Sequence, residues 1–310
     1  MSKTKKQTRN RWILIAIVAA CLAAPNGTFI KLALEELDIF SFSSLRFGLI
    51  ALVTLPYLFM VYQKFTKKNF KYSLYAGIAM TIAVICYSTT VKLSQASYAS
   101  ITQLGIPIVF IIYSIILTKE RVKPRSLLGI SIASIGAFLV IGMPIIISGS
   151  NINPVAIVTG VIDCLVYPLC VIFFRKANES GLPIMASFCV SSVMVALICT
   201  SLALGINGSE AYSSGLSVNV ITALVYSGII VALIVRVVNV LSYEHIGSAA
   251  LSGTSYLESL MAIIIPLIVL RERLSAELVI GAILIIIGVY IVETVHNSHR
   301  HRNIHVMRHR

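Results

Sequence analysis

The sequence predicts an all-α integral membrane protein with ten transmembrane helices, arranged as two inverted five-helix repeats. Of its 310 residues, 57% are hydrophobic and only 12% are charged, and the mean hydropathy is +0.92. The apolar residues form ten long runs, and the two halves of the chain share an ordered set of residues. A chain of this composition has too little polar surface to coat a water-soluble protein, so we expect it to lie in lipid.

The ten apolar runs have the length of membrane-spanning helices, since one crossing takes about 20 residues. Barrel strands would be shorter and would alternate in polarity. Within lipid, only helices satisfy the backbone of such runs. The runs cover residues 12–30, 41–62, 72–91, 97–117, 126–147, 154–174, 183–205, 218–241, 247–270 and 277–294.

The distribution of basic residues predicts that both termini face the cytoplasm and that the protein lies in the cell membrane. Nineteen of the 25 lysines and arginines fall in the two terminal tails or in the loops at 63–71, 119–125 and 175–176. Basic residues accumulate in cytoplasmic loops, so this asymmetry favours an even number of crossings. Few basic residues fall in the loops expected on the other side: Lys31, Lys92, Arg271 and Arg273.

The amino-terminal run has an alternative interpretation as a lipoprotein signal, because a basic start precedes Val18-Ala19-Ala20-Cys21. The apolar run continues through Ile30, however, and Cys164-Leu165-Val166-Tyr167-Pro168 repeats the pattern of Cys21-Leu22-Ala23-Ala24-Pro25. We therefore expect a first membrane helix. The six cysteines all lie in apolar runs and are expected to be unpaired thiols.

An internal repeat divides the chain into residues 12–147 and 154–294, between a basic tail at 1–11 and a basic, histidine-rich tail at 295–310. A shift of 152 residues superimposes four residues of the first half on identical residues of the second. The pairs are Thr102 and Thr254, Glu120 and Glu272, Gly129 and Gly281, and Gly136 and Gly288. Five helices per half is an odd number, so the second half would enter the membrane upside down, as in many secondary transporters.

The chain resembles the drug/metabolite transporter superfamily, and within it the EamA branch of ten-helix carriers. The resemblance rests on Pro25-Asn26-Gly27, Lys31, Leu45-Arg46-Phe47 and the two Glu-Arg turns with their following glycines. One departure is that the family's proline in the ninth helix is replaced near Glu258-Ser259, with Pro266 further on. The resemblance implies a secondary carrier that works by alternating access and is similar to exporters of amino acids and related metabolites. It implies neither catalysis nor a cofactor.

Charged residues inside lipid-spanning runs are costly and are therefore candidates for function. Asp163 shares a helical face with Tyr167, and Arg236 shares one with Asn239. We hypothesise that Asp163 and Arg236 approach each other or jointly bind a zwitterion. Arg46 lies near the start of its run, which favours an anchor at the membrane interface. The remaining polar residues that could contact a substrate are Asn26, Tyr87, Tyr98, Gln103 and Tyr256.

Glu258 raises the hypothesis of proton coupling, with the alternative that its carboxyl group satisfies nearby donors. The histidines of the tail favour attraction to anionic lipid over metal capture. The expected partners are a small-molecule substrate and membrane lipids, with no nucleic acid. Monomer and homodimer both stay open, and so do substrates such as drugs, nucleosides or nucleotide-sugars. A non-transporting membrane protein is a further alternative.

Prolines and glycines predict kinks and close helix contacts. Pro25, Pro107, Pro168 and Pro266 each remove a backbone hydrogen bond from a long helix. The glycine pairs 129/136 and 281/288 are spaced seven residues apart and thus lie on one face of each helix, where small residues allow close approach. We expect these two faces to be packing seams.

Overall fold

The computed structural model describes residues 3–106, 109, 112–113, 116, 124–142, 153–212, 216–273, 275–288 and 290–291. Within these residues the structure is built from helices and their connecting turns, without a strand. Glu120, Pro107 and the histidine-rich tail lie outside the described residues. The first half contains α1 (Lys3–Ala23), α2 (Asn26–Glu36), α3 (Ile39–Met60), α4 (Lys67–Leu93), α5 (Ala96–Gln103) and α7 (Pro124–Ala137).

The second half contains α9 (Pro154–Glu179), α10 (Ile184–Asn207), α11 (Val218–Leu224) and α12 (Arg236–Val269), followed by helical residues Ala276–Gly288. Two π-helical stretches, η2 (Phe138–Gly142) and η4 (Val225–Val235), continue α7 and α11. Short 3₁₀ helices follow α3 at Tyr62–Lys64 and α10 at Gly208–Tyr212.

Six helices among the described residues are long and apolar enough to cross a membrane, counting α1 with α2 and α11 with η4. Shorter apolar helices occupy Ser131–Val140, Leu257–Val269 and Ala276–Gly288. Large apolar side chains lie exposed on these helices, among them Leu52, Phe59 and Met60. Exposed side chains of this kind suit contact with lipid and not with water. The chain is therefore a multi-pass membrane protein.

The first membrane crossing is broken at Pro25, as the sequence predicted. Ala24 and Pro25 form a turn between α1 and α2. Proline has no N–H, and the break leaves backbone carbonyls without their helical donors. The Tyr226 hydroxyl donates to the Leu22 carbonyl oxygen at 2.7 Å, and the Tyr226 ring stacks on Phe29 at 4.1 Å. A residue of η4 thus supports the break.

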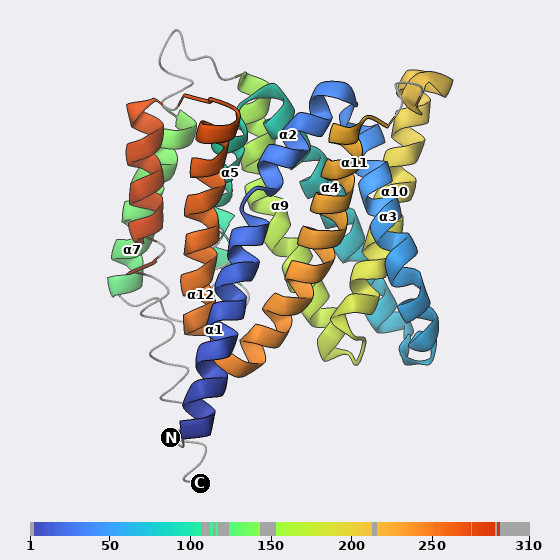
Figure 1. Ribbon diagram of the computed structural model, residues 1–310, viewed down its shortest axis with the longest axis horizontal. Coiled ribbons are helices and arrows are strands. Elements are labelled where there is room, and N and C mark those ends of the chain that lie inside the picture. The colour runs from blue at the N-terminus through green and yellow to red at the C-terminus, as the bar shows by residue number, and fades with distance from the viewer. Residues whose placement is uncertain are drawn as a thin grey trace.

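The other described prolines on which a kink was predicted leave their helices uninterrupted. Pro168 lies inside α9 and Pro266 lies inside α12. The sequence also predicted separate runs at 218–241 and 247–270, but the backbone is helical throughout 236–269. Apart from Gly247, residues 242–247 contain no strong helix breaker, so the expected loop takes a helical conformation. In Figure 1 the chain descends from α11 and ascends again along α12.

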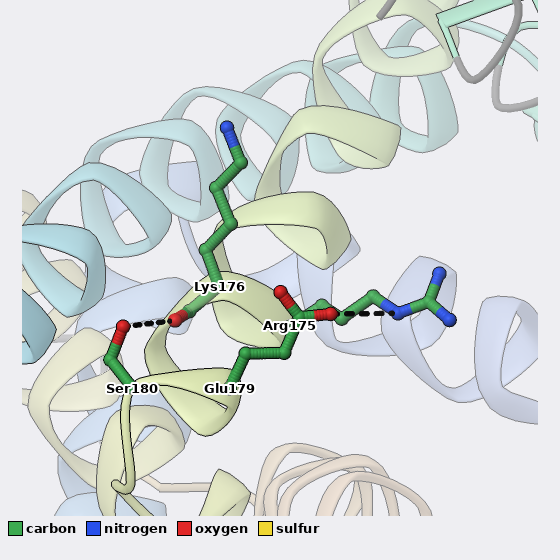
Figure 2. A network of polar contacts seen from close by, with 4 residues as sticks. All are labelled: Arg175, Lys176, Glu179 and Ser180. Atoms are coloured by element: carbon green, nitrogen blue, oxygen red, sulfur yellow. Dashed lines mark hydrogen bonds and ion pairs between the residues drawn. The ribbon is translucent and has the colours of Figure 1, made fainter. Parts of the chain in front are cut away.

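The basic turns gather at one end of the helices. Figure 1 places the turn between α3 and α4 and the turn between α9 and α10 at the same end as the N-terminus. Figure 2 shows the end of α9, where Arg175 Nε lies 3.7 Å from Glu179 Oε1 and the Ser180 hydroxyl donates to the Lys176 carbonyl oxygen at 2.9 Å. This ion pair is exposed, so it contributes little to stability.

The helices of the two halves interdigitate. α4 packs along α9, α3 packs along α10, and α1 packs along η4 and α12 (Figure 1). Serines join α4 to α10, with the Ser73 hydroxyl donating to the Ser187 hydroxyl at 3.0 Å. Threonines join α4 to α9, with the hydroxyls of Thr90 and Thr159 separated by 2.8 Å.

The predicted glycine seam is present between α7 and residues 276–288. A Cβ added at Gly136 would lie 2.6 Å from the Gly281 carbonyl oxygen, and one added at Gly288 would lie 2.5 Å from the Gly129 carbonyl oxygen. The two backbones therefore touch at both glycine pairs. Since Gly136 faces Gly281 while Gly129 faces Gly288, the two helices run antiparallel.

Candidate functional site

Asp163 is a carboxylate buried in the membrane-spanning part of α9. Its residue surface is 2% exposed, and Oδ2 accepts a hydrogen bond from Gln103 Nε2 at 3.3 Å. Gln103 is the last residue of α5, so the contact joins the two halves of the chain. A buried charge is costly unless it is paired or well hydrogen-bonded, and one long bond from a neutral amide offers limited compensation.

Small residues bring α4 and α5 close to α9 around Asp163. A Cβ at Gly105 would lie 2.8 Å from the Cys164 sulfur, and one at Gly160 would lie 3.3 Å from Thr102 Cγ2. Any larger side chain at these glycines would separate the helices. The tight packing explains how Gln103 and Asp163 come together from positions 60 residues apart.

Tyr87 of α4 lies within electrostatic range of Asp163 and hydrogen-bonds the Ser100 side chain. Its hydroxyl also approaches the start of α2, because a Cβ added at Gly27 would lie 3.0 Å from the Tyr87 oxygen and 3.7 Å from Ser100 Oγ. Gly27 thus leaves the room that Tyr87 needs beside the break in the first crossing.

Arg46 of α3 is buried, with 9% of its surface exposed. Its Nη2 donates to the Ser227 carbonyl oxygen of η4 at 3.0 Å, and its guanidinium lies 5.4 Å from the centre of the Phe47 ring. The interpretation of Arg46 as an interface anchor is wrong, because the side chain turns into the protein toward a carbonyl of the π-helix. Tyr87 lies within electrostatic range of Arg46 as well as of Asp163.

These contacts define a polar cluster composed of Tyr87, Ser100, Gln103 and Asp163. Sequence reasoning identified Tyr87, Gln103 and Asp163, and the structure brings these three together. It did not identify Ser100, although Ser100 lies three residues before Gln103 and hence on the same face of α5. It assigned Arg46 to the interface.

Other predicted site residues lie at the edge of this cluster or apart from it. Asn26 adjoins Gly27, and within the described part of the chain its buried side-chain oxygen has no hydrogen-bond partner. Tyr167 is half-buried one turn beyond Asp163 in α9. Tyr98 belongs instead to an apolar core with Ile101 and Leu104, and its buried hydroxyl has no hydrogen-bond partner among the described residues.

The predicted residues of the eighth and ninth crossings are described only in part. Glu258 is half-buried in α12. The side chains of Arg236, Asn239 and Tyr256 lie outside the part of the structure that is described, and so does the hypothesised contact between Asp163 and Arg236. Among the described residues, no group of three or more histidine, cysteine or acidic side chains could hold a metal ion.

Residues 10–142 match the model of the EamA-like transporter family, which is part of the drug/metabolite transporter superfamily. This segment of the chain is EamA-like. The matched region includes the broken first crossing and three of the four residues of the polar cluster. No curated protein matches the sequence.

The chain also resembles solved structures, and 18 of their chains match it. One of them, titled "Crystal structure of protein", has a TM-score of 0.57 and 15% sequence identity. The match covers 92% of this chain and 97% of the other. At this identity the likeness shows a shared fold, and it extends over both halves of this chain.

Hydrogen bonds from two lysines join α2 to α4 at the end of the helices opposite the N-terminus. The Lys31 ammonium of α2 donates to three carbonyl oxygens at the end of α4, those of Val91 at 2.8 Å, Lys92 at 3.1 Å and Ser94 at 2.6 Å. In return, Lys92 of α4 donates to the Leu37 carbonyl oxygen at the end of α2, at 3.1 Å. Each helix therefore has its carboxyl end capped by a lysine of the other.

At the same end of the helices, Glu272 of the second half binds the start of α5 in the first half. Its carboxylate accepts hydrogen bonds from the Ala96 N–H at 2.7 Å and the Ser97 N–H at 3.0 Å, at the start of α5. Helix starts present unpaired N–H groups and partial positive charge, which favour a carboxylate. Glu272 also lies within electrostatic range of Lys31. The repeat marked Glu272 in the sequence, but its partner α5 could not be inferred.

Proposed function

We propose that this protein is a secondary transporter that moves a small metabolite across the cytoplasmic membrane by alternating access. The proposed cargo is an amino acid or a related amine-bearing compound, and the proposed direction is export. The observation that carries the proposal is Asp163, a carboxylate buried in a membrane-spanning helix and placed where α9 meets α4 and α5. Ionisable groups at such depth mark substrate or ion pathways.

Alternating access requires two halves that exchange conformations, and we propose ten crossings in two inverted repeats covering 12–147 and 154–294. Two features support this organisation. The 152-residue shift that relates the halves converts the Gly136–Gly281 contact into the Gly288–Gly129 contact, and both contacts are present. The antiparallel course of these helices fits a two-fold axis in the membrane plane.

The contacts between helices follow the same two-fold relation between the halves. In the proposed repeat α4 corresponds to the η4–α12 crossing, and α9 corresponds to the first crossing, α1 with α2. Hence the packing of α4 on α9 becomes the packing of α1 on η4 and α12, and both occur. The seam between α3 and α10 maps onto itself. This pattern supports a substrate site at the junction of the halves, where the polar cluster lies.

The broken first crossing supports transport in a further way. Interrupted helices in transporters expose half-helix ends and backbone polar groups toward the substrate. The start of α2 adjoins Tyr87 and Ser100 of the polar cluster. We propose that Asn26 and Tyr167 take part from the edge of this cluster. Glu258 is proposed as the proton-coupling carboxyl group, and the termini are proposed to lie in the cytoplasm.

The proposal is tested by counterflow in proteoliposomes that contain the full chain, with radiolabelled standard L-amino acids as probes. We expect the wild type to exchange at least one of them. Asp163→Asn should lose at least about 90% of that exchange, because the ammonium group of the substrate loses its counter-charge. Glu179→Gln is the matched control, since it also converts a carboxylate to an amide but at an exposed site. Exchange that is absent from the wild type, or unchanged in Asp163→Asn, contradicts the proposal.

A further inference from the structure

We propose that the start of α2, at the break in the first crossing, binds the carboxylate of the transported compound. This inference rests on the proposed transport function and deepens it, because it narrows the cargo to amines that also bear a carboxylate. It assigns to Thr28, on the first turn of α2, a role in selecting that class of compound.

Two other helix starts in this protein bind a carboxylate of the chain itself. At the start of α3, the Asp38 carboxylate accepts from the N–H groups of Phe40 and Ser41, at 2.8 and 3.0 Å, and from the Ser41 hydroxyl. At the start of α5, the Glu272 carboxylate accepts from the first two N–H groups of the helix and from the Ser97 hydroxyl. Each of these sites combines two backbone N–H groups with one hydroxyl of the first turn.

The start of α2 offers a first-turn hydroxyl without a carboxylate at its N-cap. The N-cap residue is Pro25, whose side chain cannot accept a hydrogen bond. Thr28 occupies the third position of α2, as Ser41 does in α3. The N–H groups of a first helical turn have no partner within the helix, and they carry partial positive charge. Together with the Thr28 hydroxyl, they form the same combination of donors that binds Asp38 in α3.

The Thr28 hydroxyl is buried, and among the described residues it has no hydrogen-bond partner. Other buried threonines donate to the carbonyl oxygen four residues earlier, as the equally buried Thr81 does to Gly77 at 2.8 Å. For Thr28 that position is Ala24, which lies in the break. Side chains of a helix lean toward its start, so the Thr28 hydroxyl lies over the break. A buried polar atom without a partner is rare, and a bound ligand explains it.

The start of α2 also adjoins the polar cluster. A Cβ added at Gly27 would lie 3.7 Å from Ser100 Oγ of α5. Gln103, the hydrogen-bond partner of Asp163, lies on the same face of α5, three residues further on. The start of α2 and the Asp163 carboxylate thus contact α5 one helical turn apart, about 4.5 Å along its axis. A cargo whose amine and carboxylate are separated by a few bonds fits this spacing.

The break alone would also leave Thr28 without a partner, because it interrupts the turn to which the hydroxyl would donate. In that case valine, which has nearly the same shape, would replace Thr28 without any effect on ligand binding. A carboxylate-binding Thr28 predicts a loss that is selective for ligands with a carboxylate. In both cases the removal of a buried hydroxyl without a partner should leave stability unchanged or improve it.

The experiment compares ligands that differ only in the carboxylate. The purified full chain in nanodiscs is titrated with each standard L-amino acid and with the corresponding carboxamide. For any amino acid that binds, we expect the wild type to prefer it over its carboxamide by more than about tenfold, because hydrogen bonds to a charged group are the stronger ones. Thr28→Val should reduce this preference by at least about fivefold without lowering the melting temperature. Thr28→Ser, which keeps the hydroxyl, should retain the preference.

The matched control is Thr81→Val, because Thr81 is as buried as Thr28 and its hydroxyl bonds within α4. This control should keep the wild-type preference. A Thr28→Val variant that also keeps it overturns the proposal. If Thr28→Val does not fold, Thr28→Ala gives the same readout.

Two outcomes in the wild type separate this inference from the proposed function. A wild type that binds carboxamides as tightly as amino acids, and exchanges both in counterflow, overturns the carboxylate site and retains a transporter of amines. A wild type that neither binds nor exchanges any of these probes overturns the proposed function, and the carboxylate site with it.

Discussion

Glu272 and Ser97 form a cap across the two halves of the protein, in which the Ser97 N–H donates to Glu272 Oε2 at 3.0 Å and the Ser97 hydroxyl donates to the same oxygen. The two residues are 175 positions apart in the sequence. The cap holds the start of α5, the helix whose last residue, Gln103, bonds Asp163. The short helix α5 therefore links the Glu272 cap at one of its ends to the polar cluster at the other.

The first prediction concerns this cap. Glu272→Gln should weaken the hold on the amino end of α5, because a neutral amide accepts less strongly than a carboxylate and loses the attraction to the helix start. Hydrogen–deuterium exchange of residues 96–100 should rise by at least about fivefold, which corresponds to about 1 kcal/mol. Glu179→Gln, which alters an exposed carboxylate, is the control. Equal exchange in the two variants would show that the cap contributes nothing.

The second prediction concerns the glycine seam. Gly136→Ala should destabilise the protein by about 1–3 kcal/mol, because the new Cβ would lie 2.6 Å from the Gly281 carbonyl oxygen and the two backbones would have to separate. The loss is measured as a lower melting temperature in detergent. Gly48→Ala serves as control, since no atom of the residues that the structure describes lies within 4 Å of its added Cβ. A Gly136→Ala variant as stable as Gly48→Ala would refute the close seam.

The third prediction compares the two lysine caps. Lys31→Met should cost more stability than Lys92→Met, because Lys31 donates to three carbonyl oxygens and Lys92 to one. Hydrogen bonds from charged groups contribute about 1.5–3 kcal/mol each at most, so the difference should be visible in thermal unfolding of the full chain. Lys64→Met, at an exposed turn, should leave the melting temperature unchanged. A larger loss for Lys92→Met would contradict the unequal caps.

The fourth prediction separates stability from transport at the helix break. Pro25→Ala should restore a continuous first crossing, since alanine supplies an N–H and favours helix. The melting temperature should stay the same or rise, while counterflow should fall because the start of α2 no longer adjoins the polar cluster. Pro56→Ala is the control, as Pro56 lies inside the uninterrupted α3. Wild-type flux in Pro25→Ala would mean that transport does not require the break.

Much of this arrangement could be predicted from the sequence where a single helix carries the signal. Asp163 stood out because a carboxylate in an apolar run is costly, and the glycines stood out because seven-residue spacing places them on one face. The break at Pro25 followed from the missing N–H. Each of these inferences needs only the local sequence, and each agrees with the structure.

The contacts between distant segments could not be predicted in the same way. Arg46 is near the start of its apolar run, a position that favours snorkelling, and only the carbonyl of Ser227, 181 residues away, explains why it turns inward. Glu272 was visible as one member of a repeated pair, but the amino end of α5 is its partner because of the fold. The helical link through residues 242–247 was missed because a change of direction was expected to require a loop.

The reciprocal caps of α2 and α4 also bear on biogenesis. Neither Lys31 nor Lys92 can reach its carbonyl oxygens until both helices have entered the bilayer. The carboxyl end of α2 in the first crossing therefore stays uncapped until α4, the third crossing, has been inserted. A nascent chain that stops short of Ser94 would leave the Lys31 ammonium without its full set of carbonyl acceptors. The first three helices should therefore leave the translocation machinery as one group and not one at a time.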